Sequence, residues 1–140
     1  MIKKTLYILA LLSMLTLGAC THNDGDIGNW FGTWHIQDIS RDGEKVITNG
    51  EYFFQFQSSV FRVSMVNGHE QTVESFGTWD DSTEGKIIIS FPDPTVYYIE
   101  MPGLEAYNNF SIHSISTREI TLTKVDNTGA NYTYHLKKQP

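Results

Sequence analysis

Cysteine is almost absent from this sequence, which has one in 140 residues. A single cysteine cannot close an internal disulfide, so a disulfide-stapled scaffold is excluded. Basic residues are also few: 10 Lys and Arg stand against 16 Asp and Glu, and the formal net charge is −6. This balance argues against a nucleic-acid binder, which would need a basic surface. The length predicts one domain with at most a short appendage and excludes a multidomain enzyme.

Leucine and alanine, which favour helices, are scarce after residue 19. Residues 20–140 contain 3 Leu and 2 Ala against 11 Ile, 8 Phe and 12 Thr. β-Branched and aromatic residues of this kind favour strands. The composition therefore predicts an all-β domain, and no part of it shows a convincing helical period.

The first residues have the pattern of an export signal. Lys3 and Lys4 precede an uncharged, leucine-rich stretch over residues 5–17, which is shorter than the about 20 residues that a membrane-spanning helix needs. Residues 17–20 read Leu-Gly-Ala-Cys and resemble the bacterial lipobox. The resemblance implies that residues 1–19 are a lipoprotein signal peptide and that Cys20 becomes the acylated first residue of the mature chain. An ordinary secretory signal, with Cys20 as a free thiol, is the alternative.

A polar tether is expected between the anchor and the domain, over residues 20–29, because this stretch can bury little surface. Asp24 and Asp26 resemble the acidic export signals of some Bacteroidetes-type lipoproteins, although a solvated linker also explains them. The expected location is the cell envelope, as an outer-membrane lipoprotein that faces the periplasm or the cell surface. The folded domain is expected over residues 30–138.

Turn signals recur at short intervals through this domain, as at Asn49-Gly50 and Asn67-Gly68. Between them, apolar and polar residues alternate as in strands with one wet face. The predicted strands cover residues 30–39, 51–57, 60–66, 71–80, 86–91, 95–101, 109–116, 119–125 and 131–137. Consecutive hairpins without long crossovers favour an antiparallel up-and-down barrel of eight or nine strands over a Greek-key sandwich.

A four-residue motif, Phe-Gly-Thr-Trp, occurs twice and carries a family resemblance. It places Gly32 before Trp34 and Gly77 before Trp79. Gly-x-Trp in the first strand resembles the lipocalins and their calycin relatives, and the second copy is similar to lipocalin-like lipoproteins of Bacteroidetes-type bacteria, most of unknown function. The resemblance implies a lipocalin-like barrel in which Arg118 packs over the Trp34 ring. Arg118 as an ordinary hairpin charge is the alternative, and the Thr-Asp-Tyr motif of the kernel lipocalins is missing.

The residues that catalysis or metal binding requires are not grouped in the sequence. The five histidines, at positions 22, 35, 69, 113 and 135, lack metal-ligand spacing and have no acidic cluster beside them. There is no nucleophile elbow, phosphate loop or nucleotide fingerprint. We therefore expect no catalytic residues, no metal, no cofactor and no enzyme activity.

Aromatic side chains are the feature most compatible with a function, because tyrosine and tryptophan can line an apolar pocket with polar handles. The candidate ligand-binding residues are Trp34, Phe54, Phe56, Trp79, Tyr98 and Tyr132. The alternative is that they fill the barrel, since eight strands enclose either a solid core or one small ligand. The connection over residues 101–108 could cover an open end with Leu104 and Tyr107, or lie on the surface anchored by them.

The expected function is that of a membrane-anchored, lipocalin-like lipoprotein that binds a small apolar or amphipathic ligand. The alternative is a protein-interaction module, such as a calycin-type proteinase inhibitor that inserts residues 21–29 into a target cleft. Its anchorage at Cys20 leaves this segment less free to insert.

The lipobox predicts that replacing Cys20 removes the lipid. Cells fed an alkyne analogue of palmitate should label the wild-type chain and the neighbouring variant Thr21→Ser, whereas Cys20→Ser should stay unlabelled, because it lacks the thiol that carries the diacylglycerol. Click chemistry and gel fluorescence measure the label. An unlabelled wild-type chain would support the ordinary secretory signal instead.

Overall fold

Strand pairing follows the order of the chain for every strand except the short second one. The computed structural model describes residues 28–140 except 49, 69–70 and 93–100, and these residues form nine antiparallel strands in one sheet. The strands are β1 (Gly32–Arg41), β2 (Glu44–Lys45), β3 (Gly50–Gln57), β4 (Val60–Asn67), β5 (Thr72–Asp80), β6 (Lys86–Ser90), β7 (Tyr107–Ile115), β8 (Glu119–Val125) and β9 (Asn131–Lys138). The described part contains no helix, and so none long and apolar enough to cross a membrane.

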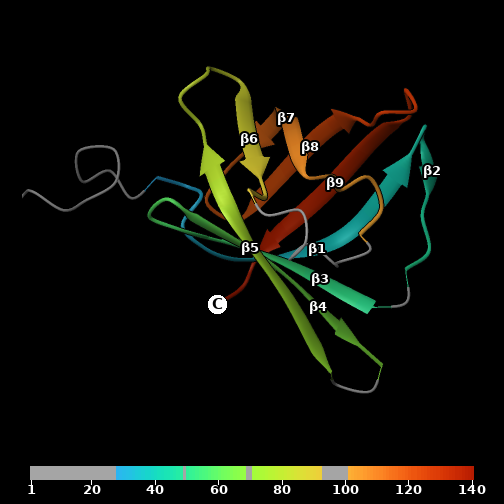
Figure 1. Ribbon diagram of the computed structural model, residues 1–140, viewed down its shortest axis with the longest axis horizontal. Helices are drawn as coiled ribbons and strands as arrows, with labels where there is room; N and C mark the ends of the chain where they lie inside the picture. The colour runs from blue at the N-terminus through green and yellow to red at the C-terminus, as the bar shows by residue number, and fades with distance from the viewer. Residues whose placement is uncertain (1–27, 49, 69–70, 93–100) are drawn as a thin grey trace, which may run out of the picture.

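Pairing between the first and last long strands closes the sheet. The sheet order is β2-β1-β3-β4-β5-β6-β7-β8-β9, and β1 also pairs with β9, so eight strands form a barrel and β2 is an extra strand (Figure 1). The β1–β9 pairing runs from Trp34 opposite Lys138 to Arg41 opposite Tyr132. We call the end at which β1 begins and β9 ends the Trp30 end, and the opposite end the Lys124 end.

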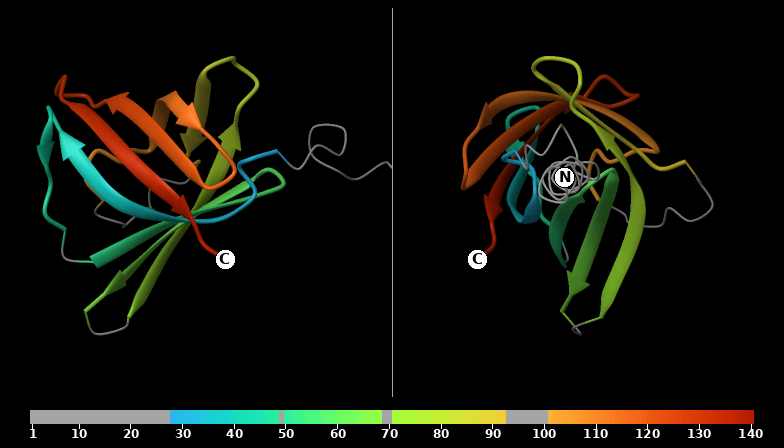
Figure 2. Two further views of the ribbon diagram at one scale, coloured as in Figure 1. Left: turned by 180° about the vertical axis from the view of Figure 1, so that it is seen from behind. Right: turned by 90° about the vertical axis from the view of Figure 1, so that its left-hand side faces the viewer.

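The barrel opens along one side. β1 pairs with β3 only between Gly32, opposite Phe56, and His35, opposite Phe53. Beyond a bulge at Gln37, β1 continues beside β9 and ends in the short hairpin with β2. Figure 2 shows β3, β4 and β5 splaying away from the far half of β1. The segment around β2 therefore lies where a β1–β3 ladder would otherwise continue.

Alternating burial makes the inner wall. On β3 the buried residues are Tyr52, Phe54 and Phe56, and their neighbours along the strand are more exposed. The same period-2 pattern buries every second residue of β8 and β9. Apolar residues facing a common interior are what the hydrophobic effect requires of a strand with one wet face.

The predicted fold class is confirmed: the protein is an all-β, antiparallel up-and-down barrel. Eight of the predicted strands overlap observed ones. The predicted strand over 95–101 lies almost wholly outside the described residues, and Met101 is buried but not in a strand. The two-residue strand β2 was not predicted, because so short a run has no alternation to detect.

The glycine of the second Phe-Gly-Thr-Trp motif lies where two strands come close together. A Cβ atom on Gly77 would lie 2.3 Å from the backbone oxygen of Ser90 and 3.1 Å from Cδ1 of Phe91. The oxygen belongs to the neighbouring strand β6, which pairs with β5 beside this position. Only a residue without a side chain allows this approach.

We expect Gly77→Ala to lower the free energy of unfolding by about 1–3 kcal/mol, because the added methyl group forces β5 and β6 apart. Gly68→Ala is the matched control. No described atom lies within 4 Å of the position of its Cβ, and its φ is not positive. Urea unfolding followed by tryptophan fluorescence measures both. Equal stability of the two variants would contradict the close approach.

Candidate functional site

Aromatic rings fill the Trp30 end. The indole Nε1 of Trp34 donates a hydrogen bond to the carbonyl oxygen of Trp30 at 2.9 Å. The ring of Phe56 lies 5.2 Å from that of Trp30 and 5.4 Å from that of Trp79, and Phe54 contacts Phe56 edge-on at 6.4 Å. All five side chains are buried. Four ligand-binding candidates, Trp34, Phe54, Phe56 and Trp79, are thus brought together here, packed against one another.

The cation over the Trp34 ring is Lys138, which corrects the expectation for Arg118. Nζ of Lys138 lies 5.4 Å from the centre of the Trp34 ring. Arg118 is exposed in the turn between β7 and β8, and its carbonyl oxygen accepts a hydrogen bond from the Lys138 N–H at 2.8 Å. The physical reason is register: Lys138 lies opposite Trp34 in the β1–β9 ladder.

The other two candidates are not part of this aromatic cluster. Tyr98 lies outside the described residues. Tyr132 is buried at the Lys124 end, where its ring stacks on that of Tyr134 with centres 6.2 Å apart. In the sheet Tyr132 lies opposite Lys124 of β8.

Residues 101–106, which lead into β7, close the Lys124 end. Met101 and Leu104 are buried in the core. Gly103 has a φ of +78°, and a Cβ atom there would lie 2.2 Å from the hydroxyl oxygen of Tyr134. That hydroxyl group donates a hydrogen bond to the carbonyl oxygen of Pro102 at 2.6 Å. The backbone of this segment therefore packs directly on the tyrosines of the inner wall. Of the two expected anchors, Leu104 is buried and Tyr107 is exposed.

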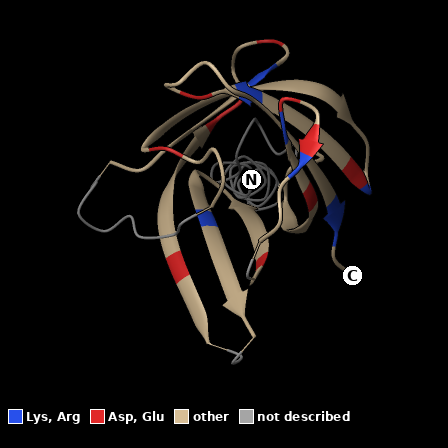
Figure 3. Ribbon diagram, turned by 90° about the vertical axis from the view of Figure 1, so that its right-hand side faces the viewer, with Lys and Arg blue, Asp and Glu red and all other residues tan. Residues whose placement is uncertain are grey.

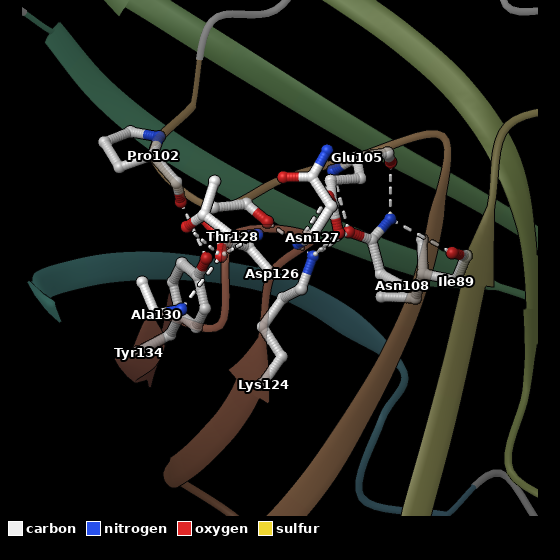
Figure 4. Close-up of polar contacts among 11 residues, drawn as sticks. Ile89, Pro102, Glu105, Asn108, Lys124, Asp126, Asn127, Thr128, Ala130 and Tyr134 are labelled. Carbon is white, nitrogen blue, oxygen red and sulfur yellow. Dashed lines mark hydrogen bonds and ion pairs between the residues drawn. The ribbon is translucent and has the colours of Figure 1, made fainter. Parts of the chain in front are cut away.

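Lys124 is a charged residue on the inner wall, and its side chain is 1% exposed. Its Nζ donates to the carbonyl oxygen of Gly103, to Oε2 of Glu105 at 2.9 Å and to Oδ1 of Asn108 at 2.8 Å (Figure 4). It also lies 5.8 Å from the centre of the Phe110 ring. An ammonium has three N–H donors, so this set satisfies it completely.

Asn108 is fully buried and connects this cluster to the barrel wall. Its Nδ2 donates to the carbonyl oxygens of Ile89 at 3.1 Å and Glu105 at 2.6 Å, and its Oδ1 accepts from the Glu105 N–H at 2.8 Å. The other carboxylate oxygen of Glu105 accepts from the Asn127 N–H at 3.1 Å. The segment is therefore held by β6, β7, β8 and the β8–β9 turn together.

A surface pocket of about 350 Å³ lies at the side opening of the barrel. Its apolar lining comes from Ile36 and Ile39 of β1 and from Val46 and Ile47 after β2. Ile47 is 91% exposed. The other five lining residues, Gln37, Asp38, Lys45, Thr48 and Tyr52, carry polar groups, so the lining is of mixed character.

Among the residues that the structure describes, the charged side chains other than Lys124 are half-buried or exposed. Those of both signs are scattered along the strands and turns (Figure 3). His135 Nδ1 lies 2.9 Å from Asp38 Oδ1, and His35 Nε2 lies 3.8 Å from Glu51 Oε1. Within the described residues, no three His, Cys, Asp or Glu side chains are grouped closely enough to hold a metal ion.

The sequence reasoning missed Lys124 and Asn108, although a signal existed. In β8, Ile120 and Leu122 face inward, so Lys124 continues the same alternation into the barrel. In β7, Asn108 precedes Phe110 on the inner face in the same way. A polar residue at an inward position was the detectable feature.

Comparisons with solved structures give the same fold. A lipocalin-like protein from Bacteroides uniformis, 17% identical, matches with a TM-score of 0.64 over 80% of this chain and 100% of its own. An uncharacterized protein from Bacteroides eggerthii, 16% identical, matches with a TM-score of 0.59 over 79% and 99%. Lobster apocrustacyanin A1, 10% identical, gives a TM-score of 0.48 over 84% and 64%. No family model and no curated protein matches the sequence. The Bacteroides likenesses show a lipocalin-like fold.

The turn that holds Glu105 contains a carboxylate with a lowered pKa. Asp126 Oδ1 accepts hydrogen bonds from the Thr128 hydroxyl group at 2.6 Å and from the N–H groups of Ala130 and Thr128. The Thr128 hydroxyl group contributes most to holding the pKa of Asp126 below its usual value. A lowered pKa stabilises the fold above the unfolded value of about 4, and this contribution is lost as the pH falls through the folded value.

We therefore expect Thr128→Val to raise the pKa of Asp126, because the largest favourable contact with the charged carboxylate disappears. Thr121→Val, on β8 outside this turn, should leave it unchanged. A carbon-13 NMR titration of the carboxyl groups measures both. An unchanged pKa in Thr128→Val would show that the backbone N–H groups alone hold the charge.

Proposed function

We propose that this chain is a lipid-anchored binding protein of the bacterial cell envelope that takes a small apolar or amphipathic ligand. The observation that carries the proposal is the pocket at the side opening of a lipocalin-like barrel. Its volume of about 350 Å³ lies within the range of roughly 300–1,000 Å³ typical of small-molecule sites. Its lining joins four aliphatic residues with five that carry polar groups, which suits an amphipathic ligand.

The exposure of Ile47 supports binding at this place. Ile47 is 91% exposed beside the pocket, so a ligand that covers it would remove apolar surface from water. Ile36 and Ile39, which are buried on the inner wall of β1, form an apolar floor for the pocket. A ligand that covers Ile47 from above and contacts this floor would bury apolar surface on both sides.

The proposed location rests on the lipobox at residues 17–20. Two or three acyl chains on Cys20 would hold the protein durably on a membrane, because each methylene group that they bury contributes about 0.8 kcal/mol of binding free energy. We propose the outer membrane, with the barrel facing the periplasm or the cell surface. The polar residues 21–29 would act as the tether.

The pocket predicts that two exposed apolar residues, Ile47 and Val125, differ in their effect on ligand affinity. Ile47→Ser should weaken the binding of 1-dodecanol by about tenfold or more, since burial of an isoleucine side chain contributes about 1.5–3 kcal/mol. Val125→Ser is the control, because Val125 is 59% exposed and is not part of the pocket. Both variants keep the core intact.

Native mass spectrometry of the cell-processed protein, titrated with 1-dodecanol in a non-ionic detergent, measures the affinities. A wild-type chain that binds no dodecanol would contradict the proposed function. Equal weakening in the two variants would contradict its assignment to this pocket.

A further inference from the structure

Lys124 places an amine side chain on the inner wall, where packing alone would favour an apolar residue. Ile120 and Leu122 face the same interior from β8, and an apolar residue at 124 would continue their pattern. Withdrawing an ammonium from water costs several kcal/mol unless acceptors replace the water. Two of the three acceptors, Gly103 and Glu105, come from the segment before β7. The wall thus supplies the cation, and the segment supplies its counter-charge.

The two partners of the ion pair differ in their access to water. The Lys124 side chain is 1% exposed, and that of Glu105 is 31% exposed. Lys124 lies in strand β8, where it pairs with Tyr132 of β9, whereas Glu105 lies in a connection outside any strand. The carboxylate is therefore the partner that can leave toward solvent while the cation stays in place.

A second inward-facing donor serves the same segment. Tyr134 of β9 donates its hydroxyl hydrogen to the Pro102 carbonyl oxygen, and Lys124 donates to the oxygen of the next residue, Gly103. In the β8–β9 ladder Leu122 lies opposite Tyr134 and Lys124 opposite Tyr132, so the two donors are diagonal neighbours on the inner wall. An ammonium and a hydroxyl group placed in this way suit the two oxygens of one carboxylate.

Residues 101–105 have the chemistry of an amphipathic acid. Met101 and Leu104 place apolar groups in the core, and Glu105 places a carboxylate on the buried cation. A ligand with one apolar chain and one carboxylate would replace each of these contacts in kind. A neutral ligand would leave the ammonium buried without its counter-charge, which is costly.

We infer that the Lys124 end is a binding site for an alkyl carboxylate. Residues 101–105 withdraw when this ligand binds. Its acid group then pairs with Lys124 and Tyr134, and its alkyl chain takes the place of Met101 and Leu104. The inference rests on the proposed function, because it names the ligand class and the charged anchor of the same barrel. Ile39 connects the two places: it lines the side pocket and lies opposite Tyr134 in the β1–β9 ladder.

The test compares dodecanoate with 1-dodecanol, which share a chain and differ in the acid group. Both are titrated into the cell-processed protein and followed by native mass spectrometry. The wild-type chain should bind dodecanoate more tightly than dodecanol, and Lys124→Met should remove that preference. Glu105→Gln should strengthen dodecanoate binding by about fivefold or more, because the competing carboxylate is gone.

Glu119→Gln is the matched control, since Glu119 is an exposed residue at the far end of the same strand and its loss changes the net charge equally. Equal dodecanoate affinity in Glu105→Gln and Glu119→Gln would overturn the inference, even if Lys124→Met does not fold. Dodecanol binding without a preference for dodecanoate would overturn the inference and leave the proposed function standing. A wild-type chain that binds neither compound would overturn both.

Discussion

A buried ammonium group must keep its acceptors, and at Lys124 this requirement organises one whole end of the barrel. The acceptors come from Gly103, Glu105 and Asn108, so the segment before β7 must fold into the barrel mouth. Glu105 in turn accepts from the Asn127 N–H and thereby connects the segment to the β8–β9 turn. The positive φ of Gly103 and the absence of its side chain let the backbone reach the tyrosines below. Without the ammonium group, the oxygens of Gly103 and Glu105 would lose the donor that holds this segment in the barrel mouth.

The two ends of the barrel are consequently stabilised by different interactions. At the Trp30 end, edge-on and tilted aromatic contacts such as Phe56 with Trp79 fill the interior with side chains from the strands themselves. At the Lys124 end, a connecting segment fills the interior and is held by hydrogen bonds and one ion pair. Removing a packed aromatic side chain leaves a cavity in the core. The hydrogen bonds and the ion pair at the Lys124 end can instead be made by another molecule that carries the same polar groups. This difference is why we place recognition of the ligand's carboxylate at the Lys124 end.

Much of the fold could be predicted from the sequence, because alternation and turn residues are local signals. The strands around Phe54 and Leu122 were predicted within one residue at either end. What could not be predicted depends on register. Lys138 and Arg118 are both basic residues near the end of the barrel, and only the pairing of β1 with β9 decides which one reaches Trp34. Leu104 and Tyr107 looked equivalent as anchors, yet β7 begins at Tyr107 with its inner face on Asn108 and Phe110, so the tyrosine points outward.

The central claim is that residues 101–106 close the barrel by standing in for a carboxylate ligand at Lys124. Hydrogen–deuterium exchange of their amide groups, with and without saturating dodecanoate, tests this most directly. The account predicts that dodecanoate accelerates exchange at Leu104 and Glu105, whose N–H groups bond to Met101 and Asn108, while the β8 and β9 amides stay protected. Exchange in this segment that is unchanged or slowed by bound dodecanoate would contradict it.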